Sequence, residues 1–421
     1  MSYYHLELLT PRVEQARSNI GLGGGYAWGG DFYPIWLTSR ELLAHRRGPY
    51  SAEMTREIQS GLYGRPLSPS HPNDPPISYR RFAYPLYTDL IFAPVAFFPF
   101  SLVRIGLAVL LPLSAALAVL AWIYALPHTL SKTQVALILI LTLGSYPLLE
   151  ALFAEQAGIF VATLLAAAVA AATSARYKTA GFLLALATMK PQMALPVILW
   201  LFIWTMPAWH RRKSLILTFL ASEILLYGLG ELLSPGWLLE WFHVLGEYSH
   251  YTAPALPSEI LGSDLGTAVS CISLVIVAGV CWQLRHARSD SSDFTLAISS
   301  VLCVTVLAVQ SAAAIYDYFL LFPVVLAIWN WRESLRSQGH GSRILFNLAG
   351  ALLLWQWTAA SAVTVLGLML PGARMSAFTL RLPLFAILPL PFVLFALLAP
   401  KLVRALPWIV HHDAGGNRTF Q

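Results

Sequence analysis

Asp31 is the acidic side chain of this sequence whose surroundings best suit catalysis. It follows Gly29 and Gly30, which permit close backbone approach, and precedes the aromatic run at 32–36. It lies in a polar stretch that ends before the first apolar segment, so we expect it outside a membrane and near the surface. A carboxylate placed there could take the proton from an acceptor hydroxyl as a general base. The simpler interpretations are a solvated loop acid or the N-cap of a helix starting at Tyr33.

Lys190 interrupts an apolar run and is followed by Pro191, which breaks helices. A lysine at the centre of a membrane costs about 2.5–3.5 kcal/mol on insertion scales, so such residues face a cavity or a partner. We interpret Lys190 as a cation for a lipid phosphate; the alternative is a lysine that extends to the membrane surface. Arg80 and Arg81 stand just before the first apolar segment and could bind the same phosphate or anchor that segment.

Two polar stretches between apolar runs supply further candidates. QSAAAIYDYFL contains Tyr316 and Asp317, and Asp317 could hold a sugar hydroxyl or the acceptor, or could cap a helix. EALFAEQAG contains Glu150, Glu155 and Gln156. If this turn faces outward, all three join the same site, with Gln156 as a substrate-binding residue; if it faces inward, they are ordinary loop residues. Gln192, directly after the Lys-Pro step, is a further candidate for substrate binding.

The sequence gives no reason to expect a metal or a cofactor. His411 and His412 lie in a polar tail without metal-ligand spacing to any helix. No phosphate-cradling GxxxxGK[ST] loop is present, so a nucleotide donor is not expected. The cysteines all lie inside apolar runs, as buried structural thiols do: Cys271, Cys281 and Cys303.

The elements that must position these residues are membrane helices. Only 11% of the residues are charged, against about 25% in soluble proteins. The apolar runs are continuous and about 20 residues long, which suits helices that cross a bilayer and excludes a membrane barrel. The net charge of +6 comes from loops between the runs, so it does not indicate nucleic-acid binding. We predict an all-α polytopic membrane protein of about nine to eleven segments.

The expected apolar segments lie at roughly 84–100, 102–125, 134–152, 156–173, 179–206, 214–233, 265–284, 294–312, 315–331, 344–369 and 382–399. The part from 84 to 206 fits either five crossings or three crossings and two re-entrant segments. The second arrangement breaks 179–206 into two half-helices that meet at Lys190 and Pro191, and such breaks occur where backbone lines a cavity. Loop charge favours this second arrangement.

Basic loops fix the expected orientation, because loops rich in Lys and Arg stay in the cytoplasm. They lie at 210–213, 285–288 and 332–343. The expected organisation is an extracytoplasmic loop at 1–83, membrane modules at 84–233 and 265–400, an extracytoplasmic loop at 234–264 and a cytoplasmic tail at 401–421. Interfacial helices are expected near 39–48, with Leu42 and Leu43 inward, and at 237–251. Export of the 1–83 loop needs a preceding span, so we expect a truncated or mis-started N-terminus or an unusual use of the first span.

Three stretches, in this order, resemble bacterial glycosyltransferase family 87, which belongs to the C-type superfamily. The first is DFYPIW with the GPY step at 48–50 and FAYPLYTDLIFAPVAFFPF; the second is EQAG followed by AGFLLALATMKPQMALPVILW and HRRK; the third is SAAAIYDYFLLFP. The sequence departs from the family's pattern in three places. The family's first span is missing, residues 84–86 carry one proline where many members have two, and Asp317 stands where some members have histidine.

The resemblance implies a polyprenyl-phosphate-linked sugar donor, typically carrying mannose, and an inverting transfer to a lipid or glycan acceptor. The reaction would take place on the outer face of the inner membrane, with Asp31 as the catalytic base and membrane lipids as surroundings. The residues then predict that Lys190, helped by Arg80 or Arg81, binds the donor phosphate. The alternatives are a lipid or polysaccharide transporter or flippase, and a structural membrane subunit.

Overall fold

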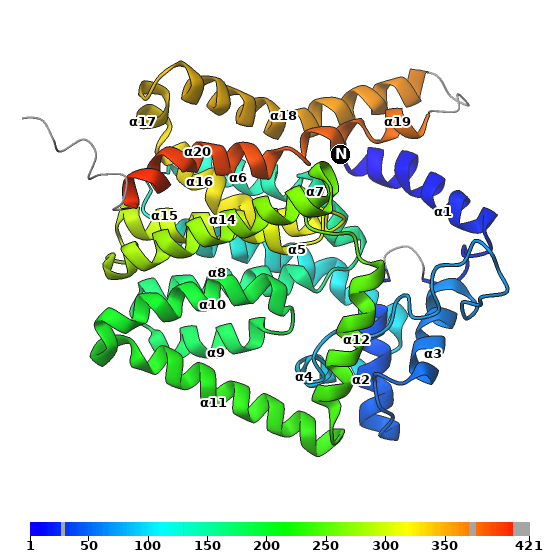
Figure 1. The fold of residues 1–421 in the computed structure, drawn as a ribbon. Helices are drawn as coiled ribbons and strands as arrows, with labels where there is room; N and C mark the ends of the chain where they lie inside the picture. The colour runs from blue at the N-terminus through cyan, green and yellow to red at the C-terminus, as the bar shows by residue number, and fades with distance from the viewer. Residues whose placement is uncertain (27–29, 129, 370–375, 407–421) are drawn as a thin grey trace, which may run out of the picture.

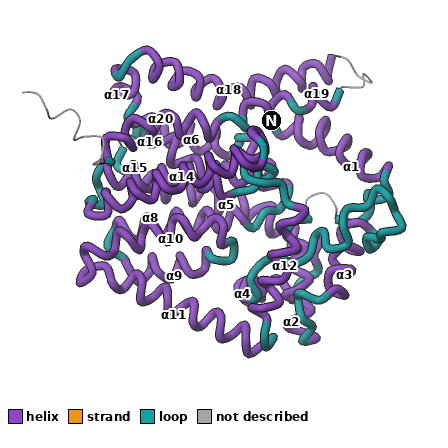
Figure 2. The backbone as a smooth tube through the Cα atoms, viewed as in Figure 1, coloured by secondary structure: helices purple, strands orange, loops and turns teal. Residues whose placement is uncertain are grey.

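The computed structural model describes residues 1–26, 30–128, 130–369 and 376–406. Throughout this part the chain consists of helices and connecting loops without a strand (Figure 2). The expected all-α fold is therefore confirmed. Gly29 and residues 407–421 of the expected cytoplasmic tail lie outside the described residues.

Most helices lie side by side in one bundle (Figure 1). Five helices gather at one end of it: α1 (Thr10–Asn19), α2 (Tyr33–His45), α3 (Ala52–Tyr63), α4 (Tyr87–Ile91) and α12 (Trp237–Tyr251). The bundle helices are α5 (Phe100–Ala125), α6 (Lys132–Leu143), α7 (Tyr146–Phe153), α8 (Gly158–Thr173), α9 (Tyr177–Ala187), α10 (Pro191–Thr205), α11 (Trp209–Leu233), α14 (Ser263–Gln283), α15 (Ser292–Val304), α16 (Phe322–Asn330), α18 (His340–Met369) and α20 (Leu390–Ala405). A short helix η6 (Ile315–Leu321) precedes α16.

Six helical stretches of the described chain are long and apolar enough to cross a membrane, or seven if the bent pair α6 and α7 counts as one span. They are Phe100–Ala125, Pro191–Leu233, Ser263–His286, Ser292–Val309, His340–Met369 and Leu382–Ala405. Three shorter apolar helices accompany them: Gly158–Thr173, Tyr177–Ala187 and Ile315–Asn330. These stretches make the protein a polytopic membrane protein.

The expected membrane segment at 84–100 is wrong. The chain there forms two short helices, α4 (Tyr87–Ile91) and η2 (Ala93–Phe97). Pro94 and Pro99 lack a backbone N–H and cannot continue a helix. The apolar side chains of this stretch pack partly against α2 instead of forming a span.

The expected break in the segment 179–206 is confirmed. Helix α9 ends at Ala187, and α10 begins at Pro191 after a turn in which Lys190 has non-helical backbone angles, φ −125° and ψ 79°. Because proline cannot donate an amide hydrogen, it suits the first position of a new helix. A Cβ on Gly181 would lie 2.2 Å from the Leu215 carbonyl oxygen, so glycine is what lets α9 pack directly on α11.

The N-terminal region differs in detail from the expected interfacial helix at 39–48. Helix α2 spans Tyr33–His45, and its side chains at 33–39 are buried within the protein. Of the two leucines expected to face inward, Leu42 is fully buried and Leu43 is half-buried. Helix α3 (Ala52–Tyr63) follows, with the Ser51 hydroxyl capping its first turn. The helix expected at 237–251 is present as α12 (Trp237–Tyr251).

Candidate functional site

Asp31 is fixed in place by its backbone. Its N–H donates to the Ala154 carbonyl oxygen at 3.1 Å, which ties the start of α2 to the turn between α7 and α8. A Cβ on the preceding Gly30 would lie 2.1 Å from the Tyr26 carbonyl oxygen, so only glycine fits there. The N-cap of α2 is Phe32, and no side chain caps it. Asp31 is therefore not a helix cap, and its carboxylate is available for other contacts.

The two oxygens of the Asp31 carboxylate have different partners. Arg80 donates to Oδ1 at 2.5 Å, and the Gln156 amide nitrogen donates to Oδ2. Arg80 is itself held by a hydrogen bond to the Tyr63 hydroxyl at 3.3 Å. The Asp31 side chain is 21% exposed. Because a carboxylate offers about four lone-pair sites, Asp31 can still accept a substrate hydroxyl.

Lys190 is buried among helices instead of extending to a surface, with 7% of the residue exposed. Its ammonium nitrogen lies 3.3 Å from Asp317 Oδ1 and 3.4 Å from Gln156 Oε1. It also lies 5.0 Å from the centre of the Tyr316 ring, within the range of a cation–π contact. The ammonium is thus compensated by a carboxylate, an amide oxygen and an aromatic face.

Gln156 joins these two groups. Its amide NH2 donates to Asp31, and its carbonyl oxygen accepts from Lys190. The resulting series of contacts runs from Arg80 through Asp31, Gln156 and Lys190 to Asp317. Five positions that are far apart in the sequence therefore form one polar network.

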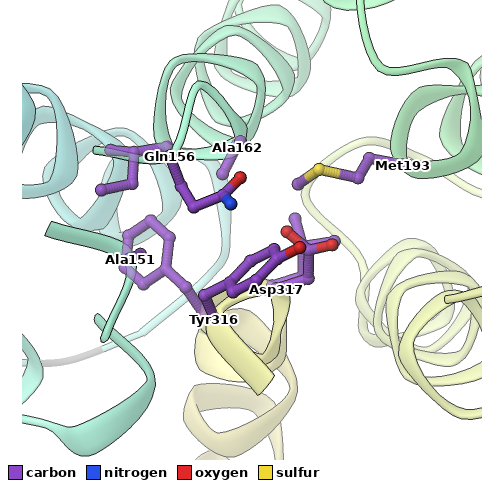
Figure 3. A pocket seen from close by; sticks show the side chains of 10 residues that line it. Ala151, Gln156, Ala162, Met193, Tyr316 and Asp317 are labelled. Carbon is purple, nitrogen blue, oxygen red and sulfur yellow. The ribbon is translucent and has the colours of Figure 1, made fainter. Parts of the chain in front are cut away.

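A small cavity lies beside this network (Figure 3). Gln156, Tyr316 and Asp317 point into one space, and Met193 of α10 lines it from another side. The cavity encloses about 10 Å³, room for about one water molecule. Gly158 forms part of its wall, and a Cβ there would lie 2.9 Å from Lys190 Nζ and 3.0 Å from Asp317 Oδ1.

Two predicted residues are not part of the network. Arg81 donates to Glu247 of α12 and to the Tyr50 carbonyl oxygen, the latter at 2.7 Å. It therefore connects α12 to the loop before α4. Gln192 lies in the first turn of α10, is exposed and does not line the cavity. Among the acids of EALFAEQAG, Glu150 contacts His5 Nε2 at 2.7 Å, away from Asp31.

Glu155 and Arg104 lie next to the network, and sequence reasoning gave them no definite role. Arg104 Nε donates to Glu155 Oε1 at 2.5 Å. Burial raises the pKa of Glu155 above its ordinary value, and the hydrogen bond from Arg104 opposes that rise. One sequence signal for Arg104 existed: it is a charge near the start of the apolar run 102–125. Gly158 carried no such signal, because its importance depends on what surrounds it in space.

Metal binding by a cluster of acids and histidines finds no support in the described part of the chain. No group of three or more His, Cys, Asp and Glu side chains there could hold an ion. The charged groups near Asp31 are instead arranged as pairs, Arg80 with Asp31 and Lys190 with Asp317. This arrangement can bind an anion and accept a proton.

Comparison with known proteins gives one family. The model of glycosyltransferase family 87 matches residues 82–311. No curated protein and no solved structure matches the chain. The matched region contains Gln156 and Lys190, while Asp31 lies before it and Asp317 after it. Since the match covers more than half of the sequence, the chain belongs to glycosyltransferase family 87 and is a membrane glycosyltransferase.

Proposed function

We propose that this transferase moves a hexose, in the first instance mannose, from a polyprenyl-phosphate donor to a lipid or glycan acceptor. The observation that carries the proposal is the Gln156 bridge, which places the Asp31 carboxylate and the Lys190 ammonium in one network. A base for the acceptor and a cation for the donor phosphate are the two groups that this reaction requires.

The position of the network supports a reaction on the extracytoplasmic face of the inner membrane. Helix α10 starts at Pro191, next to Lys190, and ends at Thr205, shortly before the basic residues 210–213 at the start of α11. Its 15 residues correspond to about 22 Å of helix. The basic residues are expected on the cytoplasmic side. The network then lies toward the opposite face.

The proposed reaction is a single inverting displacement. Asp31 accepts the proton of the acceptor hydroxyl while that oxygen forms a bond to the anomeric carbon. The bond between this carbon and the phosphate oxygen breaks, and polyprenyl phosphate leaves with the electron pair. Lys190 and Arg80 stabilise the charge that develops on the phosphate. Attack opposite the leaving group inverts the anomeric centre.

Donor binding must change the side-chain arrangement. The cavity of about 10 Å³ is far smaller than the roughly 300 Å³ of an ordinary ligand pocket. We therefore expect Arg80, whose side chain is 27% exposed, to move from Asp31 to the phosphate when the donor enters. This movement would also free Asp31 Oδ1 for the acceptor hydroxyl.

The test uses purified protein in lipid nanodiscs with radiolabelled polyprenyl-phosphate-mannose and a total-lipid acceptor extract. Polyprenyl-phosphate-glucose serves as the second donor. Labelled product from the wild-type protein, and none from Asp31→Asn, is the expected result. Asp290→Asn is the matched control, because Asp290 is an exposed acid that contacts Arg288 in the loop before α15. Wild-type turnover by Asp31→Asn removes Asp31 from the role of base.

The transporter alternative predicts a different result in the same preparation. Reconstituted liposomes would move the labelled lipid between leaflets without forming a product. In that case neither the wild-type protein nor Asp31→Asn would transfer sugar to an acceptor. Movement without product would overturn the proposed reaction.

A further inference from the structure

Glu155 has a backbone conformation that disfavours every residue with a side chain. Its φ is +56°, in the left-handed region that glycine occupies freely. The Glu155 N–H donates to the Leu152 carbonyl at 3.2 Å, and the Gln156 N–H donates to the Ala151 carbonyl at 2.9 Å. This pair of hydrogen bonds defines a Schellman motif at the end of α7, in which glycine is the usual residue at the position of Glu155.

The same motif recurs at the end of α8, with a plain side chain at the corresponding position. Ala175 follows α8, has φ +58° and donates its N–H to the Ala172 carbonyl at 3.1 Å. The N–H of Arg176 donates to the Ala171 carbonyl at 2.8 Å. Ala175 therefore reports what the backbone conformation alone costs, without a charged side chain.

The Glu155 side chain adds a second unfavourable feature. The residue is only 7% exposed. Its Oε1 accepts from Arg104, but its buried Oε2 has no hydrogen-bond partner among the described residues. A buried carboxylate oxygen without a partner destabilises the folded state. Glutamate at this position therefore disfavours folding in two independent ways.

Both neighbours of Glu155 contact the candidate base. The Ala154 carbonyl accepts the Asp31 N–H, and the Gln156 side chain donates to the Asp31 carboxylate. The contact between Glu155 and Arg104 links this turn to α5 and so fixes the direction in which Gln156 leaves the backbone. Strain of this kind persists where the surrounding structure enforces it, and it clusters at functional sites.

We propose that Glu155 is a positioning residue, which uses its contact with Arg104 to hold the turn 154–156 so that Gln156 orients the Asp31 carboxylate. The effect of Glu155 on turnover rests on the transferase reaction proposed above. The effect of Glu155 on stability and on the contact between Asp31 and Gln156 is independent of that reaction. The two ideas therefore fail in different experiments.

The experiment compares three variants of the full chain in nanodiscs. Glu155→Gly removes the strain and the side chain, Ala175→Gly removes the same strain at the end of α8, and Glu155→Gln keeps an acceptor for Arg104. We expect both glycine variants to raise the thermal unfolding midpoint, by about 2 °C or more. Only Glu155→Gly should lower kcat, by about tenfold or more with an unchanged KM for the donor. Glu155→Gln should restore most of the lost kcat.

A second measurement needs no activity. A double-mutant cycle with Asp31→Asn and Gln156→Ala, read by thermal unfolding, gives the coupling between these two residues. We expect this coupling to be present in the wild-type background and in Ala175→Gly, and to fall by at least half in Glu155→Gly. An unchanged coupling in Glu155→Gly overturns the proposal.

The remaining outcomes separate the two ideas. Lower stability in Glu155→Gly than in the wild-type protein also contradicts the positioning role, because it makes the carboxylate a net structural support. An unchanged kcat in Glu155→Gly contradicts it as well. If the wild-type protein forms no product from any polyprenyl-phosphate sugar, the proposed reaction fails, and the coupling measurement alone decides the role of Glu155.

Discussion

Arg80 and Arg81 are adjacent in the sequence but bind different carboxylates. Arg80 binds the Asp31 carboxylate at 2.5 Å, and Arg81 binds Glu247 of α12. Alternate residues of the loop before α4, like Arg81, contact α12: Tyr79 packs on Tyr251, and the Ala83 carbonyl accepts from Trp241. One arginine therefore belongs to the candidate site and the other to the attachment of α12.

This division predicts different effects on activity for two equivalent substitutions. Arg80→Gln should raise the KM for the donor and lower kcat, because Arg80 contacts Asp31, whereas Arg81→Gln should leave both nearly unchanged. Arg81→Gln should lower the free energy of unfolding by about 1–3 kcal/mol, since it removes charge-assisted hydrogen bonds. Donor kinetics and thermal unfolding of both variants check this. Equal effects on activity would show that Arg81 also contacts substrate.

Lys190 and Asp317 form a buried pair, with 8% and 3% of their side chains exposed. Removing one partner leaves the other charge buried and alone, so Lys190→Met and Asp317→Asn should each lower the free energy of unfolding by about 3–5 kcal/mol. The double variant should be more stable than either single variant, because neither charge remains. Chemical or thermal unfolding of the three proteins measures this. A double variant that shows the full sum of both losses would contradict the pairing.

Gly158 leaves the space that Lys190 and Asp317 occupy. In Gly158→Ala the new methyl group lies 2.9 Å from the lysine nitrogen, so the ammonium must move. We expect turnover to fall about tenfold or more, while the unfolding midpoint changes little because alanine favours helices. Gly228→Ala in α11 is the control, because a Cβ there meets nothing within 4 Å. Equal activity of the two variants would show that the position of Lys190 is unimportant.

The contact between Arg65 and Asp74, in the loop before Arg80, should stabilise the fold at neutral pH and lose this effect in acid. Arg65 donates to both oxygens of Asp74, at 2.6 and 2.7 Å, and these hydrogen bonds hold the pKa of the Asp74 carboxyl below its usual range. A lowered folded-state pKa stabilises the fold above the unfolded pKa of about 4, and this contribution is lost as pH falls toward the folded value.

Asp74→Asn should therefore lower the unfolding midpoint by a constant amount from neutral pH to about pH 5. The difference from the wild-type protein should then shrink below about pH 4. Thermal unfolding of both proteins across this range gives the comparison. A difference that grows as the pH falls has the wrong sign for this contact.

The sequence was sufficient to predict the helical membrane fold, the break at Lys190 and the group of candidates that contains Asp31, Gln156, Tyr316 and Asp317. The break follows from residue type, because a charge in an apolar run is costly and proline ends a helix. The other candidates follow from their place in polar stretches beside apolar runs. The structure brings these residues together in one network.

The partners of individual side chains could not be predicted, because they depend on how distant helices pack. Arg80 and Arg81 have the same type and setting, and only the packing of α12 distinguishes them. Gln192 and Met193 are adjacent, but the turn of α10 directs the methionine into the cavity. The wrongly predicted membrane segment at 84–100 is a different case. Its prolines are visible in the sequence, but the prediction gave more weight to the length of its apolar run.

The pairing of charges at the site has a consequence for ionic strength. Two cations and two carboxylates stand together, Arg80 with Asp31 and Lys190 with Asp317. With both carboxyls ionised, the four charges sum to zero, so the site exerts little long-range attraction on a passing anion. Donor capture should then depend only weakly on salt. The donor would be selected by its prenyl chain in the bilayer and by the exchange, on Arg80, of the Asp31 carboxylate for the donor phosphate.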